Sequence, residues 1–187
     1  PLITDYDLYL FGEGNHTRIY DRLGAHLTTV GGVEGVHFAV WAPNARSVRV
    51  VGDFNSWDGR LGIMRSMGTT GIWELFVPAV EAGSHYKFEL ITAEGKMILK
   101  TDPFAFYCEK PPQTASVIHG LPRHEWQDRE WMLVRARHQA LDAPISIYEV
   151  HLGSWMRGDA NNYLTYDELA ERLVPYAKDM GFTHIEC

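Results

Sequence analysis

The amino-acid sequence predicts an all-β sandwich that is followed by the first β-α-β unit of an α/β fold. Between residues 31 and 120, short runs of alternating apolar and polar residues are separated by turns that contain glycine or proline. From residue 145 the pattern changes to a strand, a helix and a second strand. Because parallel strands joined by a helix need neighbouring strands to cover their edges, we expect the α/β part to be incomplete at Cys187.

The composition changes divide the chain into four segments. Residues 1–30 include polar and glycine-rich stretches, such as the loop expected at 11–16, and predict a linker segment, whereas residues 31–120 predict the β-sandwich. Residues 121–144 predict a second, polar linker, and residues 145–187 the start of the α/β domain. We therefore expect one complete domain and part of another.

The strands of the sandwich are predicted from runs in which every second residue is apolar. In the first run, Val36, Phe38 and Val40 alternate with their neighbours, so their side chains should share one face. The predicted strands cover residues 36–41, 48–51, 72–77, 86–91 and 97–99.

The α/β segment carries clear helix signals between strands at 145–153 and 182–186. Thr165 and Glu168 have the spacing of a capping box, in which each residue satisfies a backbone N–H of the other. Gly181 suits the C-terminal end of the helix. The side chains expected to pack on the sheet are Leu169, Leu173, Tyr176 and Met180.

The bulk composition excludes several classes of protein. A net charge of −7 disfavours binding to the phosphate backbone of nucleic acids. The two cysteines form neither a disulfide framework nor a metal-binding spacing, so we expect a reducing, cytoplasmic location and no cofactor. No apolar run has the length of a membrane span, and no secretory signal is visible.

A loop after the second predicted strand presents the strongest candidate binding residues. An exposed Trp57 could stack on the apolar face of a sugar ring, and Asn55 could bond its hydroxyl groups. Lys87 alternates with core residues and should point outward, where it could also reach a sugar hydroxyl. The alternative for Phe54 and Trp57 is packing at the end of the sandwich, which the sequence favours for Phe54; the alternative for Lys87 is a solvated charge.

The nine histidines do not predict a metal site, since their spacing contains no His-Glu-x-x-His and no His/Cys cluster. His151 and His184 fall on the two predicted parallel strands, each with a glutamate two residues away, Glu149 and Glu186. A metal or acid–base site is one interpretation of this pattern. Polar packing between the strands is the other, and we favour it.

Several segments together resemble bacterial glycogen branching enzymes of the α-amylase superfamily. The resemblance is carried by YLFGEG, IYDRLGAH, VHFAVWAP, VGDFNSW, IYEVHLGSW and GFTHIE, at residues 9–14, 19–26, 36–43, 51–57, 147–155 and 181–186. It implies an immunoglobulin-like sandwich of carbohydrate-binding module family 48, followed by the first β-α-β unit of a truncated (β/α)8 TIM barrel. The first and the fifth of these segments favour branching enzymes over debranching relatives.

The resemblance also implies an activity for the full-length protein. Such an enzyme cuts an α-1,4 link in glycogen or another α-1,4-glucan and transfers the released segment to a glucose 6-hydroxyl, through an aspartate nucleophile and a glutamate acid–base. Those carboxylates would lie beyond Cys187, so we assign no catalytic residue here and expect these 187 residues alone to be inactive. We expect the full-length enzyme to be a monomer without a metal.

One departure from the family bears on glycan binding. Glycan-binding relatives carry a second tryptophan after the glycine of the hairpin at 94–97, where this chain has Met97. Two alternatives to a branching enzyme segment remain open, a separate glycan-binding module and a glycogen-debranching relative. A sandwich that only supports the barrel is a third hypothesis, which is compatible with a branching enzyme.

Overall fold

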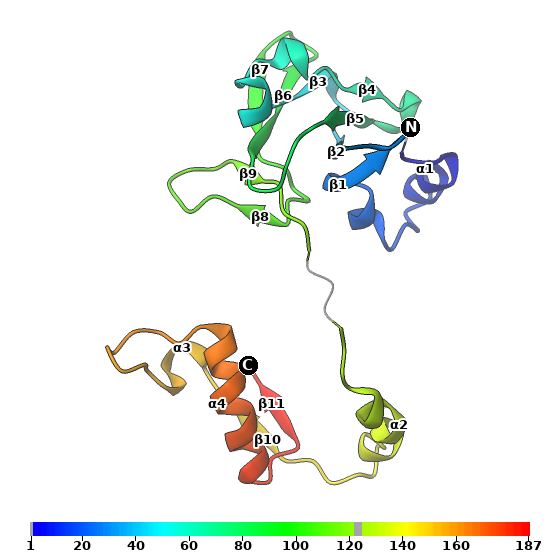
Figure 1. The fold of residues 1–187 in the computed structure, drawn as a ribbon. Helices are drawn as coiled ribbons and strands as arrows, with labels where there is room; N and C mark the ends of the chain where they lie inside the picture. Colours follow the sequence, from blue (N-terminus) through cyan, green and yellow to red (C-terminus); the bar gives the residue numbers. More distant parts are fainter. Residues whose placement is uncertain (1, 122–124) are drawn as a thin grey trace. The chain divides into compact units, whose positions relative to one another are not determined.

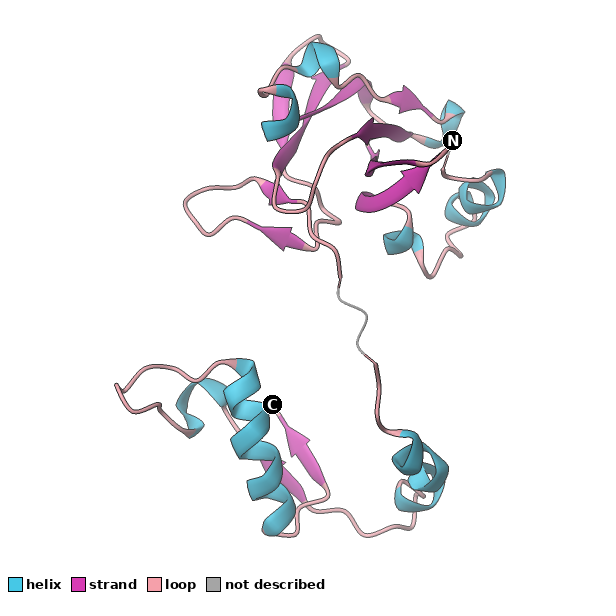
Figure 2. Cartoon of the chain, viewed as in Figure 1, coloured by secondary structure: helices cyan, strands magenta, loops and turns pink. Residues whose placement is uncertain are grey.

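The computed structural model describes residues 2–121 and 125–187 and divides the chain into two compact units, residues 1–123 and 124–187 (Figure 1). The first unit is built almost entirely from antiparallel strands, and the second combines helices with a small parallel sheet (Figure 2). The all-β class and the later change to α/β architecture are therefore confirmed.

Two sheets make up the first unit. One has the strand order β1-β2-β5-β4, and the other has the order β3-β6-β9-β8 with β7 paired to β6. The first sheet contains β1 (Gly24–Val30), β2 (Val33–Trp41), β4 (Arg65–Ser66) and β5 (Ile72–Pro78). The second contains β3 (Ala45–Gly52), β6 (His85–Thr92), β7 (Met97–Lys100), β8 (Tyr107–Cys108) and β9 (Ser116–Val117).

Short helices connect and flank these strands. The chain begins with α1 (Asp5–Gly12) and η1 (Ile19–Asp21), and three single turns follow later. Those turns are η2 (Asp53–Asn55), η3 (Gly59–Leu61) and η4 (Gly68–Thr70). Of these, η2 begins directly where β3 ends, so it carries the predicted binding loop.

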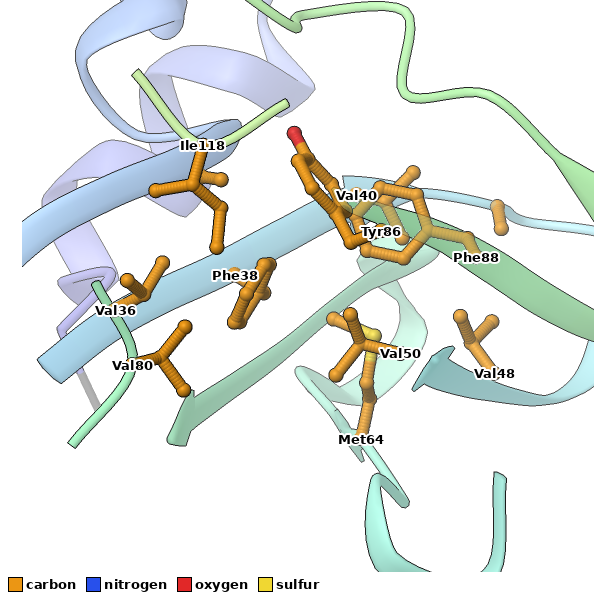
Figure 3. Close-up of a cluster of buried hydrophobic side chains, with 12 residues drawn as sticks. Val36, Phe38, Val40, Val48, Val50, Met64, Val80, Tyr86, Phe88 and Ile118 are labelled. Atoms are coloured by element: carbon orange, nitrogen blue, oxygen red, sulfur yellow. The ribbon is translucent and has the colours of Figure 1, made fainter. Parts of the chain in front are cut away.

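The main core of the first unit forms from the inward faces of the two sheets (Figure 3). Val36 and Phe38 of β2 are fully buried, as are Val50 of β3 and Tyr86 and Phe88 of β6. These residues are two positions apart within each strand, as the period-two pattern requires. The predicted sharing of one face by Tyr86, Phe88 and Leu90 is confirmed, since Leu90 packs against the same cluster.

The structure corrects the prediction that residues 1–30 are only a linker. Gly24–Val30 forms β1, which pairs with β2 along its whole length. A second apolar cluster includes Ile3 and Leu23 and lies against Ala39 of β2 and Ile72 of β5. The N-terminal residues therefore belong to the first unit, because they bury apolar side chains on the outer face of its first sheet.

The second unit contains a parallel pair of strands joined through a helix. Its elements are α2 (Arg129–His138), β10 (Ile147–Glu149), α3 (Leu152–Trp155), α4 (Tyr166–Asp179) and β11 (His184–Glu186). Strands β10 and β11 pair in parallel, with α4 between them in the sequence. The predicted β-α-β unit is thus present in the structure.

Several local predictions in the second unit need correction. The segment 121–144 contains α2, although its residues 122–124 lie outside the described residues. The strand expected at 145–153 ends at Glu149, and α3 occupies the residues that follow. On α4, Leu169 and Leu173 are buried as predicted, and Tyr176 packs on β10 through Tyr148, with ring centroids 5.7 Å apart. Ala177 is a further buried residue that was not predicted, and Met180 is exposed.

Both predicted ends of α4 are confirmed. Thr165 accepts a hydrogen bond from the Glu168 backbone N–H, and Glu168 accepts one from the Thr165 backbone N–H at 2.7 Å. Gly181 follows the helix with a positive φ of 82°. This left-handed conformation costs glycine little, because it has no Cβ atom.

Candidate carbohydrate-binding surface

Asn55 holds the turn that follows β3. Its side-chain Oδ1 accepts a hydrogen bond from the Gly52 backbone N–H at 2.9 Å, and its Nδ2 donates to the Val50 carbonyl oxygen at 3.0 Å. The side chain is half-buried. The structure thus gives Asn55 a role in shaping the loop, while its contact with a glycan stays a prediction.

Trp57 is presented by an unusual stretch of backbone. Ser56 and Trp57 have φ angles of 54° and 60°, in the left-handed region where residues other than glycine are uncommon. The Trp57 backbone N–H donates to the Gly52 carbonyl oxygen at 2.9 Å, which closes the turn. As a result the Trp57 side chain lies at the surface with 41% of its area exposed.

Asp53 joins the loop to the neighbouring strand. Its Oδ1 accepts a hydrogen bond from the indole Nε1–H of Trp57 at 3.1 Å. Its Oδ2 accepts from the backbone N–H of His85 at 2.8 Å and lies 2.9 Å from the His85 ring Nδ1. The backbone N–H of His85 holds the pKa of Asp53 below its usual value, with further lowering by the His85 and Trp57 side chains.

Lys87 lies on the same outward face of β6 as His85. The two residues are separated by Tyr86, which points into the core, so their side chains leave the strand on the opposite side. Lys87 Nζ donates to Thr114 Oγ1 at 2.7 Å. Asp53 links the Trp57 loop to β6, since it accepts hydrogen bonds from the Trp57 indole and from the backbone N–H of His85. Strand β6 also carries Lys87.

The core interpretation of Phe54 is confirmed. Its ring centroid lies 5.4 Å from that of Phe38, and it packs against the main core cluster. The neighbouring aromatic residues of the loop therefore differ in role, because Phe54 fills the sandwich and Trp57 remains exposed.

The sequence analysis missed Asp53, His85 and Glu109. Glu109 Oε1 lies 3.6 Å from His85 Nε2, and its Oε2 accepts a hydrogen bond from the Ala115 backbone N–H at 2.8 Å. The available signal was the alternation of β6, which places His85 on the face of Lys87. The pairing with Asp53 depends on a contact between residues 32 positions apart, which no local pattern reveals.

His151 and His184 of the second unit make separate contacts in the structure. His184 is the register partner of Ile147, whereas His151 follows the end of β10 and its Nδ1 lies 3.0 Å from Ser154 Oγ. Glu149 and Glu186 are register partners. Among residues 2–121 and 125–187, no three His, Cys, Asp or Glu side chains are grouped as a metal site would require.

The helices of the described part of the chain include none with the length and apolar character of a membrane span.

Comparison with known families identifies the first unit. Residues 22–105 match the family Carbohydrate-binding module 48 (Isoamylase N-terminal domain). The matched part begins just before β1, includes the Trp57 loop and Lys87, and ends shortly after β7, so this part of the first unit is similar to modules of family 48.

The similarity to curated proteins extends beyond the family 48 module and covers the whole chain. The chain is 56% identical over 187 residues to a 1,4-alpha-glucan branching enzyme of Rubrobacter xylanophilus and 54% identical over 189 aligned positions to one of Roseobacter denitrificans. A branching enzyme of a Nostoc species is 49% identical over 209 aligned positions. The chain spans about a quarter of the length of these relatives, 26–27%. The resemblance to bacterial branching enzymes is thus confirmed.

Solved structures support the same fold at lower sequence identity. A putative alpha amylase from Salmonella typhimurium aligns with 88% of this chain and 24% of its own, at a TM-score of 0.54 and 20% identity. The catalytic module of the pneumococcal glycogen-degrading protein SpuA aligns with 90% of this chain and 28% of its own, at a TM-score of 0.56 and 22% identity. The chain therefore shares its fold with the aligned parts of these two proteins.

Proposed function

We propose that the chain is the front part of a bacterial 1,4-alpha-glucan branching enzyme, which moves an α-1,4-glucan segment to a glucose 6-hydroxyl. The observation that supports this most strongly is the 56% identity to such an enzyme across all 187 residues. The family 48 match ends at residue 105, whereas the similarity to the branching enzyme continues through the β-α-β unit. If the protein were only a glycan-binding module, the similarity of residues 106–187 to a branching enzyme would be unexplained.

The β-α-β unit supports the proposal that a (β/α)8 barrel begins in this chain. Strands β10 and β11 are parallel, and their crossover runs through α4, which is the repeating unit of such a barrel. Active sites of these barrels lie at the carboxyl ends of several different strands. In the proposed enzyme the aspartate nucleophile and glutamate acid–base would come from later strands, so no residue of this chain receives a catalytic role.

Iodine staining of amylose tests this activity in the protein that continues beyond Cys187. A branching enzyme shortens the unbranched segments of amylose, so the absorbance of the iodine complex should fall and shift to shorter wavelength. The isolated 187 residues should leave the stain unchanged. If the longer protein instead hydrolyses only α-1,6 links, the debranching alternative is correct.

We further propose that the Trp57 surface of the module binds α-1,4-glucan. The half-exposed indole offers a flat apolar face, and Lys87 provides a hydrogen-bond donor on the connected strand. This combination suits a sugar, whose ring has an apolar face and a rim of hydroxyl groups. Thr114, the present acceptor of the Lys87 bond, is itself exposed, so a sugar hydroxyl could compete for the same donor.

A titration with maltoheptaose tests the binding proposal in this chain. Tryptophan fluorescence should change in a saturable way, and Trp57→Ala should remove that change. Trp131→Ala is the matched control, because Trp131 of α2 is similarly exposed, at 44%, and lies in the other unit. An equal response in wild type and Trp57→Ala would reject the Trp57 surface as the binding site.

A further inference from the structure

We propose that Asp53 is a positioning residue, which fixes the Trp57 indole in the orientation that a glycan ring stacks upon. The inference rests on the proposed binding of glucan at Trp57 and adds the residue that prepares this side chain for binding. Asp53 belongs to η2, at the start of the loop that ends in Trp57.

The backbone hydrogen bonds of the loop do not fix the orientation of the Trp57 indole, whereas its side-chain hydrogen bond does. Hydrogen bonds from Ser56, Trp57 and Asp58 to preceding carbonyl oxygens hold the main chain of the turn. They do not restrict rotation about the two side-chain torsions of Trp57. The bond from its indole Nε1–H to Asp53 Oδ1, 3.1 Å long, does restrict them.

The Asp53 carboxylate is itself held from the other side. Its Oδ2 faces two nitrogens of one residue, the backbone N and the ring Nδ1 of His85, at 2.8 and 2.9 Å. His85 belongs to β6, whose backbone is fixed by its pairing with β3 and β9. The carboxylate therefore connects the indole to a rigid strand, because Oδ1 bonds the indole and Oδ2 bonds His85 of β6.

Glu109, the residue that follows β8, helps to hold the His85 ring. The other ring nitrogen of His85 lies 3.6 Å from Glu109 Oε1, and Glu109 also accepts the Ala115 backbone N–H. Both ring nitrogens of His85 thus face carboxylate oxygens, which limits rotation of the ring. The strongly hydrogen-bonded state of Asp53 agrees with its lowered pKa, because hydrogen-bond donors favour the ionised carboxylate.

Positioning of this kind should strengthen binding without adding a contact to the glycan. A stacking side chain that is already held in one rotamer loses little conformational freedom when the ligand binds. Loss of the Asp53 bonds should therefore weaken maltoheptaose binding about three- to tenfold, because the indole must then be ordered during binding. Removal of Trp57 itself should weaken binding further.

Two measurements on the 187-residue chain test the proposal with Asp53→Ala. The first is the dissociation constant of maltoheptaose, which should rise about three- to tenfold. The second is the indole N–H signal of Trp57 in the NMR spectrum of the free protein, assigned by its absence in Trp57→Ala. That signal should shift and exchange faster with water in Asp53→Ala, since its acceptor is gone.

Asp58→Ala is the matched control. Asp58 lies in the same loop and carries the same charge, but its carboxylate pairs with Arg60. This variant should leave both the affinity and the Trp57 indole signal close to those of wild type. An equal loss of affinity in the two aspartate variants would overturn the proposal, because it would reflect the loss of negative charge.

Asp53→Asn is a second variant for the case that Asp53→Ala does not fold. Its amide has an oxygen on one side and an NH2 group on the other, so either the indole or the backbone N–H of His85 then faces a donor in place of an acceptor. The link between the indole and β6 is broken in both cases, so the indole signal should again move and the affinity should fall. A wild-type affinity or an unchanged indole signal in a folded Asp53 variant overturns the proposal. If wild type does not bind maltoheptaose, the glycan function itself fails, and the indole signal alone decides whether Asp53 holds Trp57.

Discussion

Tyr86 combines apolar packing with a buried hydrogen bond. Its ring lies 5.2 Å from that of Phe38 and 5.9 Å from that of Phe88, and its hydroxyl donates to Asp102 Oδ2 at 2.6 Å. Burial raises the pKa of Asp102, and the hydrogen bonds from Tyr86 and the Phe104 backbone oppose that rise only in part. The Asp102 carboxylate therefore depends on its donors to remain ionised inside the module.

Tyr86→Phe should destabilise the first unit by about 1–3 kcal/mol at neutral pH, since it removes a donor from a buried acceptor. The pKa of Asp102 is raised on folding, so its ionisation opposes folding as the pH rises through the raised value. The variant loses a donor that favours the ionised form, so its extra destabilisation should be smaller in acid than at pH 7. Urea unfolding at two pH values measures this.

Tyr107→Phe is the control for Tyr86→Phe, because it removes the same hydroxyl group from a tyrosine that is 53% exposed. A loss of stability in Tyr86→Phe that is no greater than in the control would contradict the role given to the buried hydroxyl.

The sequence allowed prediction of apolar packing at the level of single residues, but not of the partners of polar side chains. Phe54 was expected to pack inward and does so, whereas two interpretations were open for Trp57 and the structure shows it exposed. The local bonds of Asn55 to Gly52 and Val50 and the distant bond of Asp53 to His85 were not predicted. An amide or carboxylate in a turn has many potential partners, and only the folded backbone selects among them.

At the scale of elements, Glu74 of β5 holds the N-terminal residues against the first sheet. Its buried carboxylate accepts hydrogen bonds from the backbone N–H groups of Leu2 and Ile3, at 3.1 and 3.2 Å. Arg65 and His37 also contact it. Burial alone would raise the pKa of Glu74, but hydrogen bonds from Arg65, Ile3 and His37 outweigh it and hold the pKa below the usual value.

This arrangement predicts that acid loosens the N-terminal residues. A carboxylate whose pKa is lowered by folding stabilises the folded state above its unfolded pKa and loses that effect as the pH falls through the folded value. The amide NMR signals of Leu2 and Ile3 should therefore titrate with a midpoint below 4.5, the usual pKa of glutamate. Glu74→Gln should abolish this titration, and a midpoint above 4.5 in wild type would contradict the assignment.

The N-terminal cap of α4 is a second element-scale feature with a measurable effect. Thr165→Ala should destabilise the first turn of the helix by about 1 kcal/mol, because it removes the side-chain acceptor of that turn. Hydrogen bonds from the backbone and the hydroxyl of Thr165 lower the pKa of Glu168. In the variant that pKa should rise, and faster amide exchange at 166–168 should accompany it. Unchanged exchange there would show that the cap is not needed.

Strand and helix prediction succeeded where periodicity was long and failed at the edges of the units. The runs predicted at 36–41, 72–77 and 86–91, each six residues long, lie within β2, β5 and β6. Residues 24–30 form β1 by pairing with β2, although their own pattern resembles a turn and a polar segment. In α4 the small Ala177 is buried beside Leu169 and Leu173, and Tyr176 packs on Tyr148 of β10, whereas Met180 remains exposed. Depth of burial depends on the geometry of the sheet beneath the helix.

At the scale of the whole molecule, the two units carry different parts of the proposed function. The first unit, whose residues 22–105 match family 48, has two sheets and presents the Trp57 surface, while the second unit shows one β-α-β step with a two-stranded sheet. The sequence alone predicted this order of architectures and the resemblance to branching enzymes. It did not predict the chemistry that orients Trp57, because that depends on contacts between β6 and the loop after β3.

The proposed branching activity is tested most directly by a count of α-1,6 links and reducing ends in an α-glucan substrate. Transfer breaks one α-1,4 link and forms one α-1,6 link, so the number of reducing ends stays constant while branches accumulate. With the protein that continues beyond Cys187, proton NMR of amylose should show a growing α-1,6 signal at a constant count of reducing ends. A rising count of reducing ends without new α-1,6 links would contradict the account.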